Sequence, residues 1–324
     1  MTKLSRLAFT VIISALLLVG LAASINAQIN PTMPSQKTDS VKESFYAEFT
    51  EYKKSVNPEQ HRLAYPTAKE FMRRFGGDND YYAKEVQAFI DEYEREGREV
   101  EIFRTYNAKN YAKAFELGRA QLKITPEDFF VLGVLAEAGY DNAVSGNTSL
   151  IAETIDYARR AIKLLENGKL AKADPFKSMD IARGFLNFSL GWFLKDQSPV
   201  EAAAAFLNAV KSDSPYRSDP SAYYRLGVAT LKGEFAQLSA EYNEKFGGKP
   251  ASAEQTATLN RIKFLGERAI DAYARAVALM PKPEQAEAKN KILAQLTALY
   301  KNFHNGSDAG LNDFIASVLS KPLP

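Results

Sequence analysis

The chain of 324 residues contains no cysteine, only two histidines and a single tryptophan. The absence of cysteine excludes disulfides, thiolate metal ligands, a cysteine nucleophile and lipid attachment through a cysteine. The two histidines, His61 and His304, lie far apart in the sequence, and a two-histidine metal site would need both of them. The folded chain must therefore be held together by its hydrophobic core, for which its length is ample.

Recognisable catalytic and cofactor motifs are also missing. Gly-rich phosphate loops and nucleophile elbows are absent. The stretch HNGSDAGLND near the end is rich in oxygen atoms, and DND occupies residues 78–80. Neither has the alternating acidic pattern and closing glutamate of a calcium loop. We therefore expect no catalytic residues, no metal site, no cofactor and no enzymatic activity.

A long hydrophobic run occurs near the beginning of the chain. Lys3 and Arg6 precede an apolar stretch over residues 7–23, and small or short residues follow as far as Ala27. This pattern is typical of an export signal, so we expect residues 1–27 to be a signal peptide cleaved near Ala27. The protein is then periplasmic or extracellular. The stretch is slightly short for a membrane span, which makes a retained anchor the less favoured alternative.

The chain also has little net charge, with 41 Lys and Arg against 39 Asp and Glu. Residues 1–27 carry two basic residues and no acidic one, so their removal leaves equal numbers. This balance gives no basic footprint for nucleic acid or for an anionic membrane surface, and no membrane span is expected after the signal. Residues 28–40 are polar, contain two prolines and lack an apolar period, which predicts a disordered spacer.

Strands are not expected, because alternating runs rich in Val, Ile and Thr are missing. From residue 41 onward, Ala, Glu, Lys and Leu fill the segments between Gly and Pro breakers, which predicts an all-α fold. Residues 41–106 should form N-terminal helices. Further helices are predicted over residues 111–124, 129–140, 150–165, 179–195 and 200–211.

The string ERAIDAYARAVALMP, residues 267–281, places alanine, a ring, alanine and proline at fixed helical spacings. The spacing recurs in part over residues 200–215 and 111–126, although the latter has Gly118 and Gln121 where a ring and an alanine are expected. Small residues let two helix backbones approach closely, and a ring fills the space beside them. The predicted repeat-packing residues are Ala114, Pro126, Gly191, Ala202, Phe206, Ala209, Gly227, Ala269, Tyr273, Ala276 and Pro281.

This order of residues resembles the tetratricopeptide-repeat (TPR) family, whose unit is a helix-turn-helix of about 34 residues. The resemblance covers residues 107–304 and implies a right-handed superhelical solenoid of antiparallel helix pairs. The repeats are divergent, because the spacing from Gly133 to Gly191 is much longer than one unit. The match suggests an exported bacterial member of the family with insertions.

An insertion of about 30 residues interrupts the most faithful unit, between Gly227 and Ala269. We expect the first helix to continue past residue 235, GGKP to break it, and a new helix to begin at Ser252 with Gln255 as its capping-box partner. If this helix is continuous to Met280, it spans about 40 Å. The sequence thus predicts a projecting helical hairpin at residues 235–265.

Residues 305–324 are predicted to form a C-terminal capping helix and tail. Their apolar residues recur at helical spacing, with polar residues on the other face. An array of repeats that buries a continuous core needs such a cap at its end. The residues of this stripe are Leu311, Phe314, Ile315, Val318 and Leu319.

The family resemblance places a concave groove on the first helix of each pair. By that register, the candidate residues of a peptide groove are Phe188, Trp192, Lys195, Tyr224, Val228 and Leu231. The alternative is that some of these side chains are buried against neighbouring helices. Family members that clamp a C-terminal carboxylate have Lys and Asn at these positions, whereas this chain has mostly apolar residues, so that binding mode is not expected.

Two functions follow as alternatives. In the first, the protein is an exported scaffold that binds a protein or peptide segment in the apolar groove. In the second, it is a structural or assembly protein that forms a homo-oligomer, or contacts envelope components, through the hairpin at residues 235–265. The sequence does not identify the partner.

Overall fold

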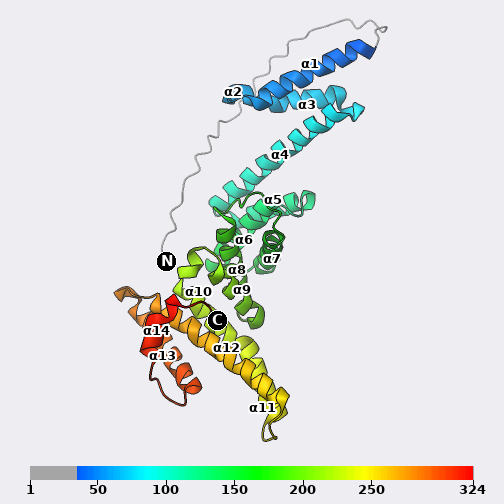
Figure 1. Ribbon diagram of the computed structural model, residues 1–324. Coiled ribbons are helices and arrows are strands. Elements are labelled where there is room, and N and C mark those ends of the chain that lie inside the picture. Colours follow the sequence, from blue (N-terminus) through cyan, green and yellow to red (C-terminus); the bar gives the residue numbers. More distant parts are fainter. Residues whose placement is uncertain (1–34, 324) are drawn as a thin grey trace. The chain divides into compact units, whose positions relative to one another are not determined.

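The computed structural model describes residues 35–323, and every regular element in that part of the chain is helical (Figure 1). The predicted all-α class is confirmed. The expected signal peptide at residues 1–27 lies outside the described residues. Among the helices of residues 35–323, none is both long enough and apolar enough to cross a membrane.

The chain forms two compact units, and the boundary between them in the sequence lies between Ile90 and Asp91, within helix α4. The first unit has a core of aromatic and small residues contributed by α1, α3 and the beginning of α4. Its elements are α1 (Ser35–Lys54), α2 (Pro58–His61), α3 (Ala64–Phe75), a 3₁₀ turn (Gly76–Asp78) and the first part of α4 (Tyr81–Asn107).

Helix α1 begins at Ser35, within the residues 28–40 for which the sequence predicts a disordered spacer. Phe49 of α1 is fully buried and packs in the core of the first unit, which fixes the helix from within. Once that part is helical, each residue added upstream gains a hydrogen bond at low cost. Helix propagation therefore extends α1 into a segment that has no apolar pattern of its own.

The DND segment at residues 78–80 pairs with a cation from the chain itself. Lys42 Nζ lies 2.5 Å from Asp78 Oδ2 and also contacts Asp80. The other oxygen of Asp80 accepts a hydrogen bond from the backbone N–H of Ala83, at 2.9 Å. These carboxylates cap and anchor the beginning of α4, which is a structural role.

The second unit contains the remainder of α4 and the helices that follow it. Consecutive helices from α5 to α10 pack on one another, and α12 packs on both α10 and α13. The positions predicted from breakers agree closely with these elements. They are α5 (Tyr111–Ile124), α6 (Phe129–Val144), α7 (Ile151–Glu166), α8 (Met179–Leu194), α9 (Pro199–Lys211), α10 (Pro220–Thr230), α11 (Ala236–Phe246), α12 (Ala253–Ala278), α13 (Ala286–Phe303) and α14 (Leu311–Ser317).

Two glycines of the second unit lie directly against aromatic rings of the next packed helix. A Cβ atom added to Gly227 would lie 2.5 Å from a carbon of the Tyr273 ring, and one added to Gly191 would lie 3.0 Å from the Phe206 ring. The repeat-packing alanines are fully buried, whereas the two prolines are exposed just beyond helix ends. The alanines are Ala114, Ala202, Ala209, Ala269 and Ala276, and the prolines are Pro126 and Pro281.

Helix α10 continues into α11 through a π-helical turn at Leu231–Phe235. Gly233 departs from helical geometry there, with φ −89° and ψ −118°. A Cβ atom on Gly233 would lie 2.9 Å from the backbone nitrogen of Val200, so the first turn of α9 occupies that space. The predicted continuation of the first helix past residue 235 is present, but this kink was not predicted.

The second helix of the hairpin, α12, begins with the predicted capping box. The backbone N–H of Gln255 donates to Ser252 Oγ at 3.1 Å, and the Gln255 side chain accepts from the backbone N–H of Ser252. Its 26 residues make it about 39 Å long. Figure 1 shows α11 and the outer part of α12 together, forming a hairpin at the lower end of the second unit.

The C-terminal segment packs against α12 but departs from a single apolar stripe. Leu311 and Val318 are buried, whereas Leu319 is 47% exposed because the helix tightens into a 3₁₀ turn at Val318–Ser320. Buried Arg275 of α12 pairs with Asp271 at 2.6 Å and donates to the carbonyl oxygens of Lys321 and Pro322. A buried ion pair therefore anchors the end of the chain.

The contact between Gly227 and the Tyr273 ring makes a test of this packing. Gly227→Ala should lower the free energy of unfolding by about 1–3 kcal/mol, because the added methyl group overlaps a ring that has no room to move. In contrast, Gly97→Ala in the exposed middle of α4 meets no atom within 4 Å and should raise stability by about 1 kcal/mol. Urea unfolding measures the change in the free energy of unfolding for each variant. Changes of the same sign in both variants would contradict the proposed packing.

Candidate functional site

Aromatic side chains gather around Tyr140 of α6 in the second unit. Its ring centroid lies between 5.6 and 6.3 Å from those of four rings of α8. The rings meet mainly edge to face, an arrangement that favours aromatic pairs beyond their burial alone. We call these five residues the ring cluster: Tyr140, Phe185, Phe188, Trp192 and Phe193.

A pocket of about 180 Å³ lies beside this cluster, and we call it the α10 pocket because four of its residues come from that helix. Lys195 joins the two features, since its Nζ atom lies 4.7 Å from the centroid of the Trp192 ring and its side chain lines the pocket. The residues that line the pocket are Lys195, Asp196, Phe206, Tyr224, Arg225, Val228, Ala229 and Lys232.

The structure brings most of the predicted groove residues into this region. Lys195, Tyr224 and Val228 line the α10 pocket, and Trp192 lies in the adjoining ring cluster. Leu231 does not line the pocket. It packs against the core at the beginning of the π-helical turn, which moves the chain away from regular helical register.

Phe188 was predicted to face the groove, but its side chain is only 5% exposed. For this residue the alternative of burial against neighbouring helices holds. Its ring stacks on that of Tyr216 at a centroid distance of 4.5 Å and also contacts Phe206. Tyr216 belongs to the 3₁₀ turn Pro215–Ser218 that joins α9 to α10. A helical register assigns no groove position to a residue of a connection, so the sequence pattern did not identify Tyr216.

Tyr224, one wall of the α10 pocket, is supported from behind by a repeat-packing residue. Its ring stacks on that of Tyr273 at 5.7 Å, with an angle of 26° between the planes. Burial raises the pKa of Tyr273 to about 12, so this phenol stays neutral. Because Gly227 sets the position of Tyr273, the glycine contact also determines where Tyr224 lies.

The charged groups of the α10 pocket are unevenly paired. Asp196 pairs with Lys195 at 3.2 Å and with Lys232 at 3.6 Å, and the hydrogen bond from Lys195 lowers the pKa of Asp196. Within the described part of the chain, Arg225 makes no hydrogen bond or ion pair, and its Nε atom is buried without a partner. Arg225 also acts on Tyr140, whose pKa is raised by burial but lowered in part by this cation.

Acidic groups approach the ring cluster from α6. Burial, with a smaller effect of the neighbouring charge of Asp141, raises the pKa of Glu137 to about 8. The Tyr106 hydroxyl donates to Asp141 at 3.2 Å, and burial raises the pKa of Tyr106. Carboxyl groups with perturbed pKa values are common at functional sites, and also occur in structural networks.

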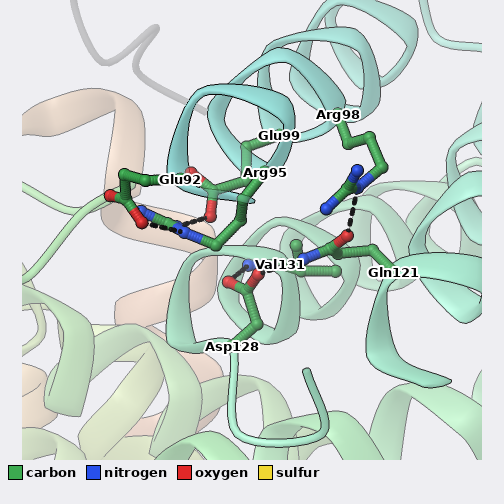
Figure 2. Close-up of polar contacts among 7 residues, drawn as sticks. All are labelled: Glu92, Arg95, Arg98, Glu99, Gln121, Asp128 and Val131. Carbon is green, nitrogen blue, oxygen red and sulfur yellow. Dashed lines mark hydrogen bonds and ion pairs between the residues drawn. The ribbon is translucent and has the colours of Figure 1, made fainter. Parts of the chain in front are cut away.

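A second group of charged side chains joins α4 to α5 and α6 (Figure 2). Arg95 contacts both Glu92 and Glu99, while Arg98 Nε donates to Gln121 at 2.6 Å. Figure 2 shows how Gln121 in turn points toward the α6 N-terminus.

There the Gln121 amide donates to Asp128 Oδ2 at 3.1 Å, and Asp128 Oδ1 accepts from the backbone N–H of Val131 at the same distance. Burial raises the pKa of Glu99 to about 7, and the nearby charge of Asp128 adds to this effect. Because these groups satisfy one another, we interpret the network as structural.

The described residues do not assemble a metal site. No group of three or more His, Asp and Glu side chains in residues 35–323 is placed to hold a metal ion. In the oxygen-rich stretch near the end, Asp308 pairs with Lys301 at 2.9 Å, and His304 stacks on Tyr300 at 3.8 Å.

Comparison of the chain with family models, with curated proteins and with solved structures finds no match. The TPR resemblance accordingly stays a prediction from the residues named above.

The buried network predicts a pH dependence of stability. Folding raises the pKa of Glu99 from 4.5 to about 7, so the folded protein binds more protons than the unfolded chain between these values. Its contribution to stability is therefore present at low pH and is lost as pH rises through this interval. In the wild type, the free energy of unfolding should fall as pH rises through this interval, and Glu99→Gln should make this fall smaller. Urea unfolding at the two ends of the interval measures the difference.

Glu101→Gln is the matched control on the same helix. A hydrogen bond from Arg104 lowers the pKa of Glu101, so its titration falls outside the interval. The Glu101 variant should keep the wild-type slope, and a wild-type slope in the Glu99 variant would contradict the assignment.

Proposed function

We propose that the protein is an exported helical-repeat scaffold that binds a protein or peptide segment at the ring cluster and the α10 pocket. The observation that carries this proposal is the joining of partly exposed rings to a pocket through Trp192 and Lys195. Aromatic anchors of this kind, held rigidly from behind, supply much of the binding energy at protein interfaces.

The size of the α10 pocket favours a segment of protein over a small cofactor. Its volume of about 180 Å³ is below the roughly 300–1,000 Å³ of most small-molecule sites. A pocket of this size can receive one side chain of a partner while the neighbouring rings cover adjacent residues. The bound segment would then be recognised by a few anchoring side chains, as in other groove-binding interactions.

We further propose that the helices of the second unit form a TPR-like solenoid, in which the site lies on the concave side. The contacts of Gly191 with Phe206 and of Gly227 with Tyr273 support this proposal, because they repeat the small-residue and ring pairing expected between helices of a unit. Export is proposed from the sequence of residues 1–27 alone.

The hairpin at residues 235–265 is the alternative binding element, but its contacts favour it less. Its apolar Phe246 is buried, and Tyr242 accepts a hydrogen bond from Gln255 at 3.2 Å within the hairpin. Phe264, at the inner end of the hairpin, is 40% exposed, with Arg261 and Arg268 over its ring. Tyr242 and Phe246 are therefore engaged within the hairpin, and two cations lie over the exposed ring of Phe264.

A photo-crosslinking experiment tests the proposed function. A photoreactive phenylalanine analogue at Val228, which lines the α10 pocket, should give a discrete adduct with a partner in intact cells. Adding Trp192→Ala with Tyr224→Ala should reduce the adduct at least about tenfold, because two ring anchors are lost. Adduct yield on a protein gel, followed by mass spectrometry, measures this effect.

Two controls accompany this experiment. The conservative pair Trp192→Phe with Tyr224→Phe keeps both rings and should retain the adduct, which separates loss of binding from loss of folding. The same analogue at fully exposed Val56 in the first unit should not give that adduct. An adduct that survives removal of both rings would contradict the groove as the binding surface.

Deletion of residues 236–262 distinguishes the hairpin alternative. Under the proposed function, the variant should keep the Val228 adduct and the oligomeric state of the wild type, because the ring cluster and the α10 pocket lie outside the deletion. Light scattering gives the mass in solution. Dissociation of an oligomer together with loss of the adduct would instead favour assembly through the hairpin.

A further inference from the structure

Arg225 is unusual among the charged residues around the candidate site. The other two cations of the α10 pocket, Lys195 and Lys232, share the carboxylate of Asp196, and Lys195 also lies over the Trp192 ring. The guanidinium of Arg225 has no acceptor within the described residues, although its Nε atom is buried. A buried donor without an acceptor costs roughly 1–3 kcal/mol.

We propose that the α10 pocket binds the carboxylate of an aspartate or glutamate side chain of the bound segment. Arg225 is the residue that donates hydrogen bonds to this carboxylate. This inference rests on the proposed function and specifies the chemistry of the partner. The planar guanidinium presents parallel N–H donors that match the two oxygens of a carboxylate.

The electrostatic balance of the pocket favours an anion. Three cations, including Arg225, and a single carboxylate, Asp196, line it, so it carries positive charge when empty. A cationic side chain of a partner would leave Arg225 without an acceptor, and a neutral amide or hydroxyl group would supply an acceptor but no negative charge to balance the pocket. An anionic side chain would supply both.

The apolar wall of the pocket favours a singly charged carboxylate over a phosphate. Phe206, Val228 and Ala229 line one part, and the ring of Tyr224 another. Removing a doubly charged phosphate from water into such surroundings costs more than removing a carboxylate, for the same Arg225 partner. The same wall would contact the methylene groups of an aspartate or glutamate.

The neighbouring ring cluster indicates which kind of side chain lies next to the acidic residue in the partner segment. Trp192 links the cluster to the pocket through Lys195, so a segment seated in the pocket also meets the partly exposed Trp192 ring. The partner segment should therefore carry a large apolar or aromatic side chain close to its acidic residue. We infer a short acidic-and-apolar recognition motif within a longer chain.

Selection from a random peptide library tests this inference. The peptides lie between constant flanking sequences, so that none offers a free C-terminal carboxylate, and the intact protein is the bait. Enriched peptides should share Asp or Glu beside a large apolar residue. Synthetic versions without tryptophan are then titrated. The fluorescence of Trp192, the single tryptophan of the chain, reports binding to variants that keep it, and isothermal titration calorimetry reports binding to the Trp192 variant.

Arg225→Gln should weaken binding of these peptides about tenfold or more, because a charge-assisted pair is lost. Arg225→Lys should restore part of the affinity. Arg104→Gln, which makes the same change of charge at an exposed position of α4 outside the pocket, should bind as the wild type does. A phosphoserine in place of the acidic residue should not bind more tightly.

Each contrary outcome identifies what is wrong. Peptides without an acidic preference, equal binding by the Arg225→Gln variant, or tighter binding of phosphoserine overturns the carboxylate assignment. If those peptides still need Trp192 and Tyr224, the proposed function stands. Binding that needs Arg225 but neither ring supports the pocket and contradicts the groove, and failure to enrich any peptide overturns both.

Discussion

The close approach of helix backbones at glycine, with a large ring beside it, is the constraint on which the second unit depends. Gly227 leaves the space that Tyr273 fills, and Tyr273 stacks on Tyr224, a wall of the α10 pocket. Gly191 leaves space for Phe206, which lines the same pocket. The rings that pack the helices therefore also shape the candidate site, so a change that loosens the packing would move the residues of that site as well.

The all-α class and the helix positions could be predicted because Gly, Pro and capping residues punctuate the sequence, and these act locally. The site could be predicted only in part. The register implied by the family resemblance named Trp192, Tyr224 and Val228 as groove candidates, because that register depends on spacing within one helix. Tyr140 and Arg225 were missed, since their importance comes from contacts between helices distant in sequence and from the absence of a partner.

The earliest of the compared repeats shows why divergence from the pattern was hard to interpret. Gly118 occupies a position where a ring is expected, and a Cβ atom there would lie 2.6 Å from Leu135 of α6. The large and small partners have exchanged helices, so the packing principle holds while the residue pattern fails. Gln121, in place of an alanine, is buried because its amide joins Arg98 to Asp128. Neither compensation can be recognised from one helix alone.

The buried polar groups that we interpret as structural have hydrogen-bond partners within the protein, whereas Arg225, which we assign to binding, has none. Arg275 is almost fully buried and has both a carboxylate and two carbonyl acceptors, and Gln121 uses both ends of its amide. At these two residues the fold supplies partners, as the cost of leaving buried polar groups unpaired requires. Arg225 is left without one beside a pocket and a surface of rings. A partner carboxylate would remove that cost on binding, so the missing acceptor lowers the stability of the free protein and adds to the affinity of the complex.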